Sequence, residues 1–303
     1  AKPNIADTQA YLLYLEDLVN QSTRGADTTW VSSCTYLVFL MQLGFCLLEL
    51  GSVKYKVQIT ALIKNMIDMT VTSIAWWLIG FGIAFGESHE GIIGKTFFAG
   101  VGIDTYSEYS LWMFQWAFAG TTATIVSGCI VERMNIWTYT YYSFYLVAWV
   151  YGMIVHWAWN PQGWMKVVGF IDFAGCGVVH LVGGAAGLIA TLMLKPRKGR
   201  FDEKNQDDFK PSNPTFVTLG TFMLWFSWYG FNCGSTINVV GDGVTYLVGL
   251  NNSLYSLNLT STSGNIHFAS TLDDGNGIAG NSVVLTTTPG SGSTIIDQSI
   301  GAT

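Results

Sequence analysis

Residues 171–194 read IDFAGCGVVHLVGGAAGLIATLML, an apolar run that contains one carboxylate, Asp172, and one imidazole, His180. An α-helix needs about 20 predominantly apolar residues to cross the hydrocarbon core of a bilayer. The glycines and alanines of this run recur at spacings that let helix backbones approach closely. The run therefore predicts a tightly packed, central transmembrane helix, and it raises the question of why such a helix carries an acid and a histidine.

Five further apolar runs predict the rest of a helical bundle, at residues 29–53, 61–85, 109–131, 137–158 and 215–238. Half of the 303 residues are hydrophobic and only 11% are charged, whereas soluble domains carry about 25% charged residues. The runs also lack the polar face of a soluble helix. We expect an all-α polytopic membrane protein with about six transmembrane helices, and the net charge of −6 excludes a basic nucleic-acid-binding protein.

Lysine and arginine are divided unevenly between the two sets of loops that alternate around these spans. One set holds ten basic residues and the other holds four. Because basic loops stay in the cytoplasm, the first set is predicted to be cytoplasmic, and the N-terminus and the C-terminal tail are predicted to be extracellular or lumenal. Three glycosylation sequons, at Asn20, Asn251 and Asn258, fall on that outer side, which favours the plasma membrane or an endomembrane.

Composition predicts three segments. Residues 1–28 form an extracellular N-terminal segment, residues 29–238 a transmembrane domain, and residues 239–303 an appendage rich in Gly, Ser, Thr and Asn. In this appendage, short alternating pieces such as SLYSLNLTST and NSVVLTTT are separated by the turn-prone DDGNG and PGSGS. This pattern predicts a β-leaning extracellular tail, and the alternative is a disordered low-complexity tail.

Two of the predicted helices carry side chains that suggest chemistry near the outer surface. Phe114 and Phe118 are four residues apart and share one helix face. At the outer start of its helix, Asp172 can cap the first amides, and His180 follows about 12 Å deeper by the helical rise. An ionisable group at that depth usually faces a cavity or a partner, although a neutral histidine bonded to a neighbouring helix is an equal alternative.

More rings and a hydroxyl collect at the same predicted mouth, namely Trp159 in HWAWNPQGW and Phe231 and Ser235 in SWYGFNCGS. Taken singly, aromatic residues near an interface are usually membrane-belt residues. Taken together, the ring faces can gather a small cation, and the hydroxyl can orient it. Because removing water from a full charge is expensive, this set favours passage of a neutral amine after the loss of a proton.

In these segments the sequence resembles the ammonium transporter family (Amt/Mep/Rh), and it is more similar to the eukaryotic Amt branch than to Rh proteins. The motifs run from about residue 29 to 235 and are LLELGSVKYK, IAWWLIGFGIAFG, FQWAFAGTTATIVSG, ERM, DFAGCGVVHLVGGAAGL and GFNCGST. The resemblance implies transport of ammonium or ammonia through an apolar pore, usually by a homotrimer with one pore per subunit. No cofactor or metal is expected.

The resemblance also implies roles along one path. The outer ammonium-recruitment site would contain Phe114, Trp159 and Ser235, and Asp172 would support it without touching the ion. Below it, Phe118 and Phe231 would form a stacked gate, and His180 would be the first of two pore histidines that relay the proton.

The resemblance covers one five-helix repeat and the first helix of the next, whereas the family fold has two inverted repeats with the pore between them. The second pore histidine has no counterpart in this sequence. Three hypotheses stay open: a transporter whose other half comes from another chain or from sequence missing here, a non-conducting membrane protein that anchors a partner-binding tail, and a truncated transporter joined to its tail by a wrong gene model.

An enzyme is the least favoured class, because no nucleophile–base pair, phosphate loop or metal cluster is evident. Lys64 and Asp68, four residues apart on one predicted helix, are expected to form a local ion pair.

Overall fold

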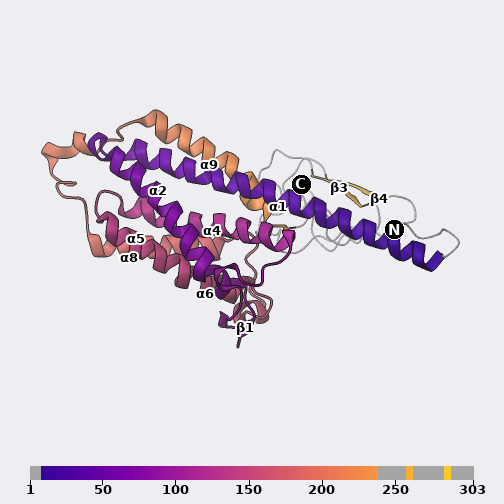
Figure 1. Ribbon diagram of the computed structural model, residues 1–303. Coiled ribbons are helices and arrows are strands. Elements are labelled where there is room, and N and C mark those ends of the chain that lie inside the picture. Colours follow the sequence, from indigo (N-terminus) through magenta and orange to yellow (C-terminus); the bar gives the residue numbers. More distant parts are fainter. Residues whose placement is uncertain (1–7, 238–256, 262–282, 288–303) are drawn as a thin grey trace. The chain divides into compact units, whose positions relative to one another are not determined.

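The computed structural model describes residues 8–237, 257–261 and 283–287. The chain divides into two compact units (Figure 1). Residues 34–231 form the larger unit, and the described residues of 1–33 and 232–303 belong to the smaller one. The sequon at Asn251 lies outside the described residues.

The larger unit is a helical bundle, and each predicted span overlaps a helical stretch, although residues 171–175 and 235–237 at the ends of two spans are not helical. The long elements are α1 (Thr8–Ser52), α2 (Gln58–Ala75), η2 (Trp76–Gly80), α3 (Phe81–Phe85), α4 (Tyr106–Ile130), α5 (Ile136–Tyr145), η4 (Leu146–Tyr151), α6 (Gly152–Trp159), η5 (Cys176–Leu181), α8 (Val182–Leu194) and α9 (Pro214–Gly234). Here η2, η4 and η5 are π-helical turns inside longer helices, so that α2 continues through η2 into α3, and α5 through η4 into α6.

Short elements connect these helices. They are η1 (Tyr55–Val57), the antiparallel pair β1 (Ser88–His89) and β2 (Ile93–Gly94), η3 (Phe98–Gly100), α7 (Trp164–Val167) and η6 (Glu203–Phe209). Within the described part of the chain, three helical stretches combine the length and the apolar composition needed to cross a membrane, at residues 10–52, 55–85 and 176–194.

Helix α8 packs tightly against α4, as its small residues predict. A Cβ atom built at Gly183 would lie 2.9 Å from Ile125 Cβ, and one at Gly187 would lie 2.7 Å from Cys129 Sγ. Both positions therefore require glycine for this approach. The opposite face carries exposed leucines at position 181 of η5 and at positions 188 and 192 of α8, so α8 lies at the edge of this unit and not at its centre as expected.

The smaller unit contains the N-terminal part of α1, the last turn of α9 and two strands. The strands β3 (Leu257–Ser261) and β4 (Val283–Thr287) pair in parallel, with Leu257 opposite Val283. They fall within SLYSLNLTST and NSVVLTTT, and the pieces of the tail between and beyond them lie outside the described residues. Residues 8–28, expected as a separate segment, continue without a break into the first predicted span as part of α1.

Candidate functional site

The carboxylate of Asp172 caps the start of η5. Its Oδ1 accepts hydrogen bonds from the amides of Gly175 (2.7 Å) and Cys176 (3.0 Å), and its Oδ2 accepts from Gly177 (2.9 Å) and Val178 (2.7 Å). These are the amides that the first turn of a helix leaves without a backbone partner. The four bonds match the capping arrangement expected from the sequence, and the negative charge is met by backbone dipoles rather than by a basic side chain.

Gly175 makes this cap possible. Its φ of 89° lies in the left-handed region, which glycine adopts without a steric cost. A Cβ atom there would also lie 2.7 Å from Val179 Cγ2. Because of this turn, the helix begins at Cys176 and not at Ile171 as predicted, and Asp172 stands outside the helix where it can reach the amides.

Trp159, the last residue of α6, joins this loop to the rings of α4. Its indole Nε1 donates a hydrogen bond to the backbone carbonyl of Asp172 at 2.6 Å. The same ring meets Phe118 edge-on, with ring centroids 6.1 Å apart and an interplanar angle of 72°, which is a favourable aromatic geometry. The indole is therefore fixed at both ends.

Three phenylalanine rings form the centre of the cluster, and each is at most 1% exposed. Phe118 on α4 and Phe231 on α9 stack, with centroids 4.0 Å apart and planes 20° apart. Phe114 lies one turn before Phe118, with centroids 4.6 Å apart. The two rings predicted to stack, Phe118 and Phe231, do so.

His180 in η5 lies directly beside these rings. Its ring is 5.3 Å from that of Phe231 and stacks on Trp228 at 5.2 Å, with planes 9° apart. Sequence reasoning missed Trp228, although its position three residues before Phe231 on α9 places both on one helix face. The π-helical form of η5 is itself a feature often found at functional sites.

The structure thus brings six of the seven predicted residues into one contiguous cluster: Phe114, Phe118, Trp159, Asp172, His180 and Phe231. The seventh, Ser235, belongs to the smaller unit, where its amide donates to the carbonyl of Asn232 at 3.3 Å.

A second buried cluster lies near the other end of α4. Lys64 Nζ on α2 is 3.0 Å from each carboxylate oxygen of Glu49 on α1, and it donates to the carbonyl of Ser127 on α4 at 3.1 Å. Asn65 donates to Glu49 at 2.8 Å. This cluster joins three helices, and its charges cancel.

The predicted ion pair between Lys64 and Asp68 is therefore wrong. Lys64 pairs with Glu49 because that carboxylate also receives bonds from Asn65 and Ser127, which completes the hydrogen-bonding shell that a buried charge needs. Asp68, at 1% exposure, instead accepts hydrogen bonds from the hydroxyls of Thr124 and Ser143.

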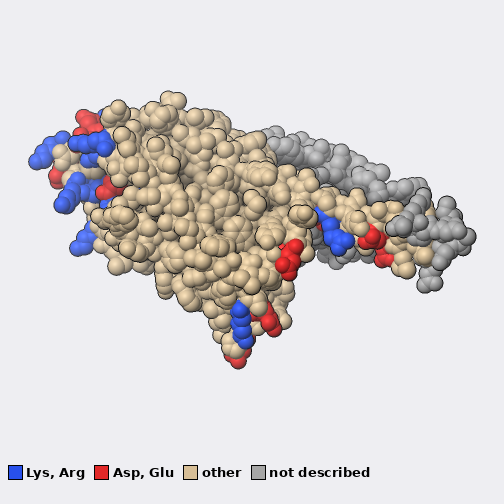
Figure 2. All heavy atoms as spheres, viewed as in Figure 1, with Lys and Arg blue, Asp and Glu red and all other residues tan. Residues whose placement is uncertain are grey.

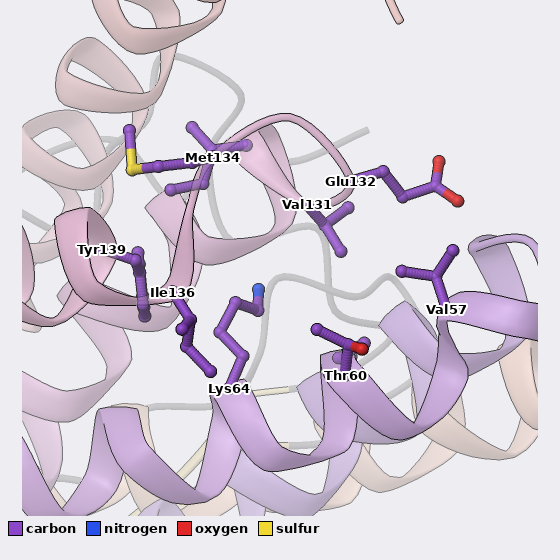
Figure 3. A pocket seen from close by; sticks show the side chains of 10 residues that line it. Val57, Thr60, Lys64, Val131, Glu132, Met134, Ile136 and Tyr139 are labelled. Atoms are coloured by element: carbon purple, nitrogen blue, oxygen red, sulfur yellow. The ribbon is translucent and has the colours of Figure 1, made fainter.

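Lys64 also borders a cavity of about 230 Å³ (Figure 3). The other lining residues are mostly apolar: Val57, Thr60, Ala61, Ile130, Val131, Glu132, Met134, Ile136 and Tyr139. Figure 3 shows Glu132 turning its carboxylate away from Lys64, and this carboxylate pairs with Arg197. Because Glu49 already neutralises Lys64, this cavity has no charge left with which to hold an ion.

Comparisons with known proteins agree with the fold and with the motifs. The model of the Ammonium Transporter Family matches residues 29–273, so the match extends well beyond Ser235, where the sequence motifs ended. The Ammonium transporter 1 member 3 of Solanum lycopersicum is 42% identical over 231 residues, which are 69% of this chain and 50% of that protein. The Ammonium transporter 3 of Dictyostelium discoideum is 35% identical over 226 residues, or 72% and 51% of the two chains.

Solved structures give the same result. A structure titled Sensor Amt Protein superposes with a TM-score of 0.69 at 36% identity, and the match covers 74% of this chain and 57% of that one. Candida albicans Mep2 superposes with a TM-score of 0.63 at 28% identity, over 70% and 49% of the two chains. The chain spans about half the length of the curated relatives it matches. By its helices, its motifs and its relatives, this chain belongs to the ammonium transporter family.

Proposed function

We propose that this chain supplies the outer half of a path along which ammonium is captured, loses its proton and crosses the membrane as ammonia. The observation that carries the proposal is the stack of Phe118 on Phe231 with the His180 ring 5.3 Å from Phe231. An apolar barrier and a proton-accepting imidazole stand side by side, which is the arrangement that proton removal before passage requires.

The energies favour this order of events. A cation held against desolvated ring faces gains about 2 kcal/mol, whereas moving a full charge into an apolar environment costs several kcal/mol even after relaxation. The rings can therefore collect the ion at Phe114 and Trp159 but cannot carry it through the stack. Leaving the proton behind removes the larger cost, and the neutral imidazole of His180 is the group beside the barrier that can accept it.

Asp172 acts at a distance in this scheme. Its oxygens are occupied by four amides, so it does not bind the ion, but its charge makes the outer mouth attractive to cations. Ser235, by resemblance to the family, adds the hydroxyl that orients the ion. These roles remain predictions for each residue.

The proposal includes a topology and an assembly. The basic loops face the cytoplasm, residues 1–28 and 239–303 face outward, and the protein is a homotrimer surrounded by lipid. Asn20 is exposed on α1 and Asn258 lies in β3. Glycosylation at Asn20, Asn251 or Asn258 would establish the outer side.

Growth at low ammonium tests the function, using a host that lacks its own ammonium transporters. We expect the parent chain to restore growth, and His180→Ala or Phe231→Ala to abolish it at equal surface expression. Leu188→Ala, on the exposed face of α8, serves as the matched control and should behave as the parent. A parent that reaches the surface without restoring growth would favour the non-conducting alternative, and a His180→Ala variant that transports normally would remove the proposed role of the histidine.

A further inference from the structure

The imidazole of His156 is a buried side chain that the proposed path does not use. It lies on α6, one turn before Trp159, and it is 0% exposed. Its Nδ1 is 3.0 Å from the carbonyl oxygen of Ala84, and its Nε2 is 2.8 Å from the hydroxyl oxygen of Ser88. The ring therefore joins α6 to residues 84–94, which contain the end of α3 and the strands β1 and β2 and are here named the docking hairpin.

The partners of His156 determine its chemical form. A carbonyl oxygen can only accept a hydrogen bond, so Nδ1 carries a proton and donates it to Ala84. The ring is neutral, because no acidic side chain in the described part of the chain lies within ion-pair distance of it and a buried charge without a partner is costly. Nε2 therefore accepts a hydrogen bond from the hydroxyl of Ser88, whose oxygen accepts in turn from the amide of Gly91 at 3.1 Å.

The charged groups of the docking hairpin lie on its surface. Figure 2 shows both acidic and basic side chains exposed around β1, and Glu87, Glu90 and Lys95 are exposed. The hydrogen bonds that hold His156 thus join neutral groups. Because bonds of this kind act only at short range and in a suitable direction, they fix a geometry rather than attract charges from a distance.

Further hydrogen bonds hold the end of α6 against the docking hairpin. Asn160, which directly follows Trp159, is 6% exposed, and its Nδ2 donates to the carbonyl of Gly86 at 3.2 Å. The indole of Trp157 donates to the carbonyl of Ile92 at 2.9 Å. Residues on both sides of Trp159 in the sequence are therefore tied to the docking hairpin, which determines where the backbone of Trp159 lies.

The position of Trp159 matters because its ring is the accessible part of the ring cluster. The indole is partly exposed, whereas the phenylalanine rings of the cluster are at most 1% exposed. A cation is attracted only when it lies over a ring face, within about 6 Å of the centroid. Side chains that bind in this way need to be held within about 0.5 Å of the productive geometry by the groups behind them.

We propose that His156 is a positioning residue for the capture of ammonium, because it fixes the indole of Trp159 by joining α6 to the docking hairpin. The inference rests on the proposed function, which assigns Trp159 to capture. His156 does not touch the ion, since Ala84 and Ser88 occupy both of its ring nitrogens. Loosening this contact weakens capture and leaves the later passage along Phe231 and His180 intact.

The test removes one bond of His156 and measures binding and uptake separately. In Ser88→Ala the imidazole Nε2 loses its donor, and we expect the dissociation constant of the purified chain for methylammonium, measured by calorimetry, to rise about five-fold. The KM of methylammonium uptake should rise by the same factor at an unchanged maximal rate. The matched control is Ser73→Ala, which removes a hydroxyl that accepts from the indole of Trp116 at 3.0 Å outside the docking hairpin and should change neither constant.

A second variant tests whether Ser88 acts through His156. In His156→Asn the amide nitrogen replaces Nδ1, so the bond to Ala84 is kept, while the shorter side chain no longer reaches Ser88. Adding Ser88→Ala to His156→Asn should then raise the dissociation constant no further, because the bond between the two residues is already absent. A similar rise in both backgrounds would show that the hydroxyl acts without the imidazole and would overturn the inference.

The outcomes separate this inference from the proposed function. If the parent binds methylammonium and Ser88→Ala weakens the binding, but no uptake occurs, then transport is contradicted and the positioning role of His156 stands. If the parent transports and Ser88→Ala leaves both constants unchanged, then the positioning role alone is overturned. A lower maximal rate or less folded protein, with an unchanged KM, would assign His156 to the stability of the fold and also overturn the role in capture.

Discussion

The carboxylates near the two ends of α4 are stabilised by different kinds of partner. At the end that carries the rings, Asp172 is held by four backbone amides and Glu108 by the amides of Asp104 and Thr105. At the other end, Glu49 pairs with Lys64 and Glu132 with Arg197. Amides supply hydrogen bonds and partial charge but leave the net charge in place, whereas a basic side chain cancels it.

This difference predicts which carboxylate matters more for the proposed function and which matters more for the stability of the fold. In the proposed path, a carboxylate that keeps its charge can act on a cation that approaches the ring cluster, so we expect Asp172 to matter more for the proposed transport than for folding. A carboxylate whose charge is cancelled acts only through the elements it ties together, so the Glu49–Lys64 pair should matter more for folding. Four substitutions, taken in order of expected effect on the free energy of unfolding, test this separation.

The largest effect is expected for Lys64→Met. The lysine is 8% exposed, and its removal leaves Glu49 buried without a counter-ion, which typically costs about 3–5 kcal/mol. The midpoint of thermal unfolding in detergent should fall strongly, and adding Glu49→Gln should recover most of the loss because it removes the unpaired charge. Lys54→Met, which breaks the more exposed pair with Asp208 at 3.9 Å, is the control and should cost at most about 1 kcal/mol. Equal losses for Lys54 and Lys64 would contradict a special role for the buried pair.

The second effect is expected for Asp172→Asn. The side chain keeps one accepting oxygen, but its new NH₂ group faces amides that also donate, so about 1–3 kcal/mol should be lost for the groups left unsatisfied. Uptake of labelled methylammonium should fall much further than this stability loss explains, because the negative charge at the mouth is gone. Measuring uptake per folded molecule separates the two contributions. Uptake that falls only in proportion to folded protein would assign Asp172 a structural role alone.

The side-chain contacts at the ring end of α4 are easier to predict from the sequence than those at its other end. The contact of Phe114 with Phe118 and the cap formed by Asp172 could be predicted because the i to i+4 spacing and the capping chemistry of an acid before a helix are local signals. The grouping of rings from different helices came from the predicted topology and the family resemblance. The pairing of Lys64 with Glu49 joins α2 to α1, and nothing in the spacing along α2 reveals a partner fifteen residues away on another helix. The local signal, Asp68, therefore gave the wrong partner.

The same limit explains the other differences. The late start of η5 depends on the left-handed turn at Gly175, and a glycine in an apolar run does not reveal its φ. Trp228 was overlooked because its contact with His180 comes from the packing of α9 against η5. The glycines of α8 indicate that one face of the helix packs closely against another helix. They do not reveal that the opposite face is exposed, and this exposure is what places α8 at the edge of the unit.

The third effect concerns the end of α8 and has the opposite sign. At Lys195, φ 62° and ψ −178° impose strain of about 1–3 kcal/mol that glycine does not experience, while the added freedom of glycine in the unfolded chain costs about 0.4–1 kcal/mol. Lys195→Gly should therefore stabilise the protein by about 1 kcal/mol in thermal unfolding. Lys198→Gly, three residues later where no positive φ occurs, should destabilise it slightly. A loss of stability for Lys195→Gly would show that the lysine side chain, and not the backbone, determines this turn.

The smallest effect is a pH dependence at the ring end, where Glu108 and Thr105 form a capping box at the start of α4. Hydrogen bonds from the backbone amides of Thr105 and Asp104, and from the Thr105 hydroxyl, lower the pKa of Glu108 below its ordinary value of 4.5. Because the pKa of the folded state is the lower one, the stabilisation is fully present above about pH 4.5 and is lost as the pH falls through the folded pKa.

Glu108→Gln should remove this part of the acid destabilisation and lower the stability at pH 7 by less than about 1 kcal/mol, since solvent screens this open site. Thermal midpoints of parent and variant, compared from pH 7 down to pH 3, give the measurement, and Glu90→Gln in an exposed loop provides the control. If the parent and Glu108→Gln lose stability in parallel below pH 4.5, the amides at this end do not discriminate in favour of the charged carboxylate. The contrast with the paired carboxylates at the other end would then rest on Asp172 alone.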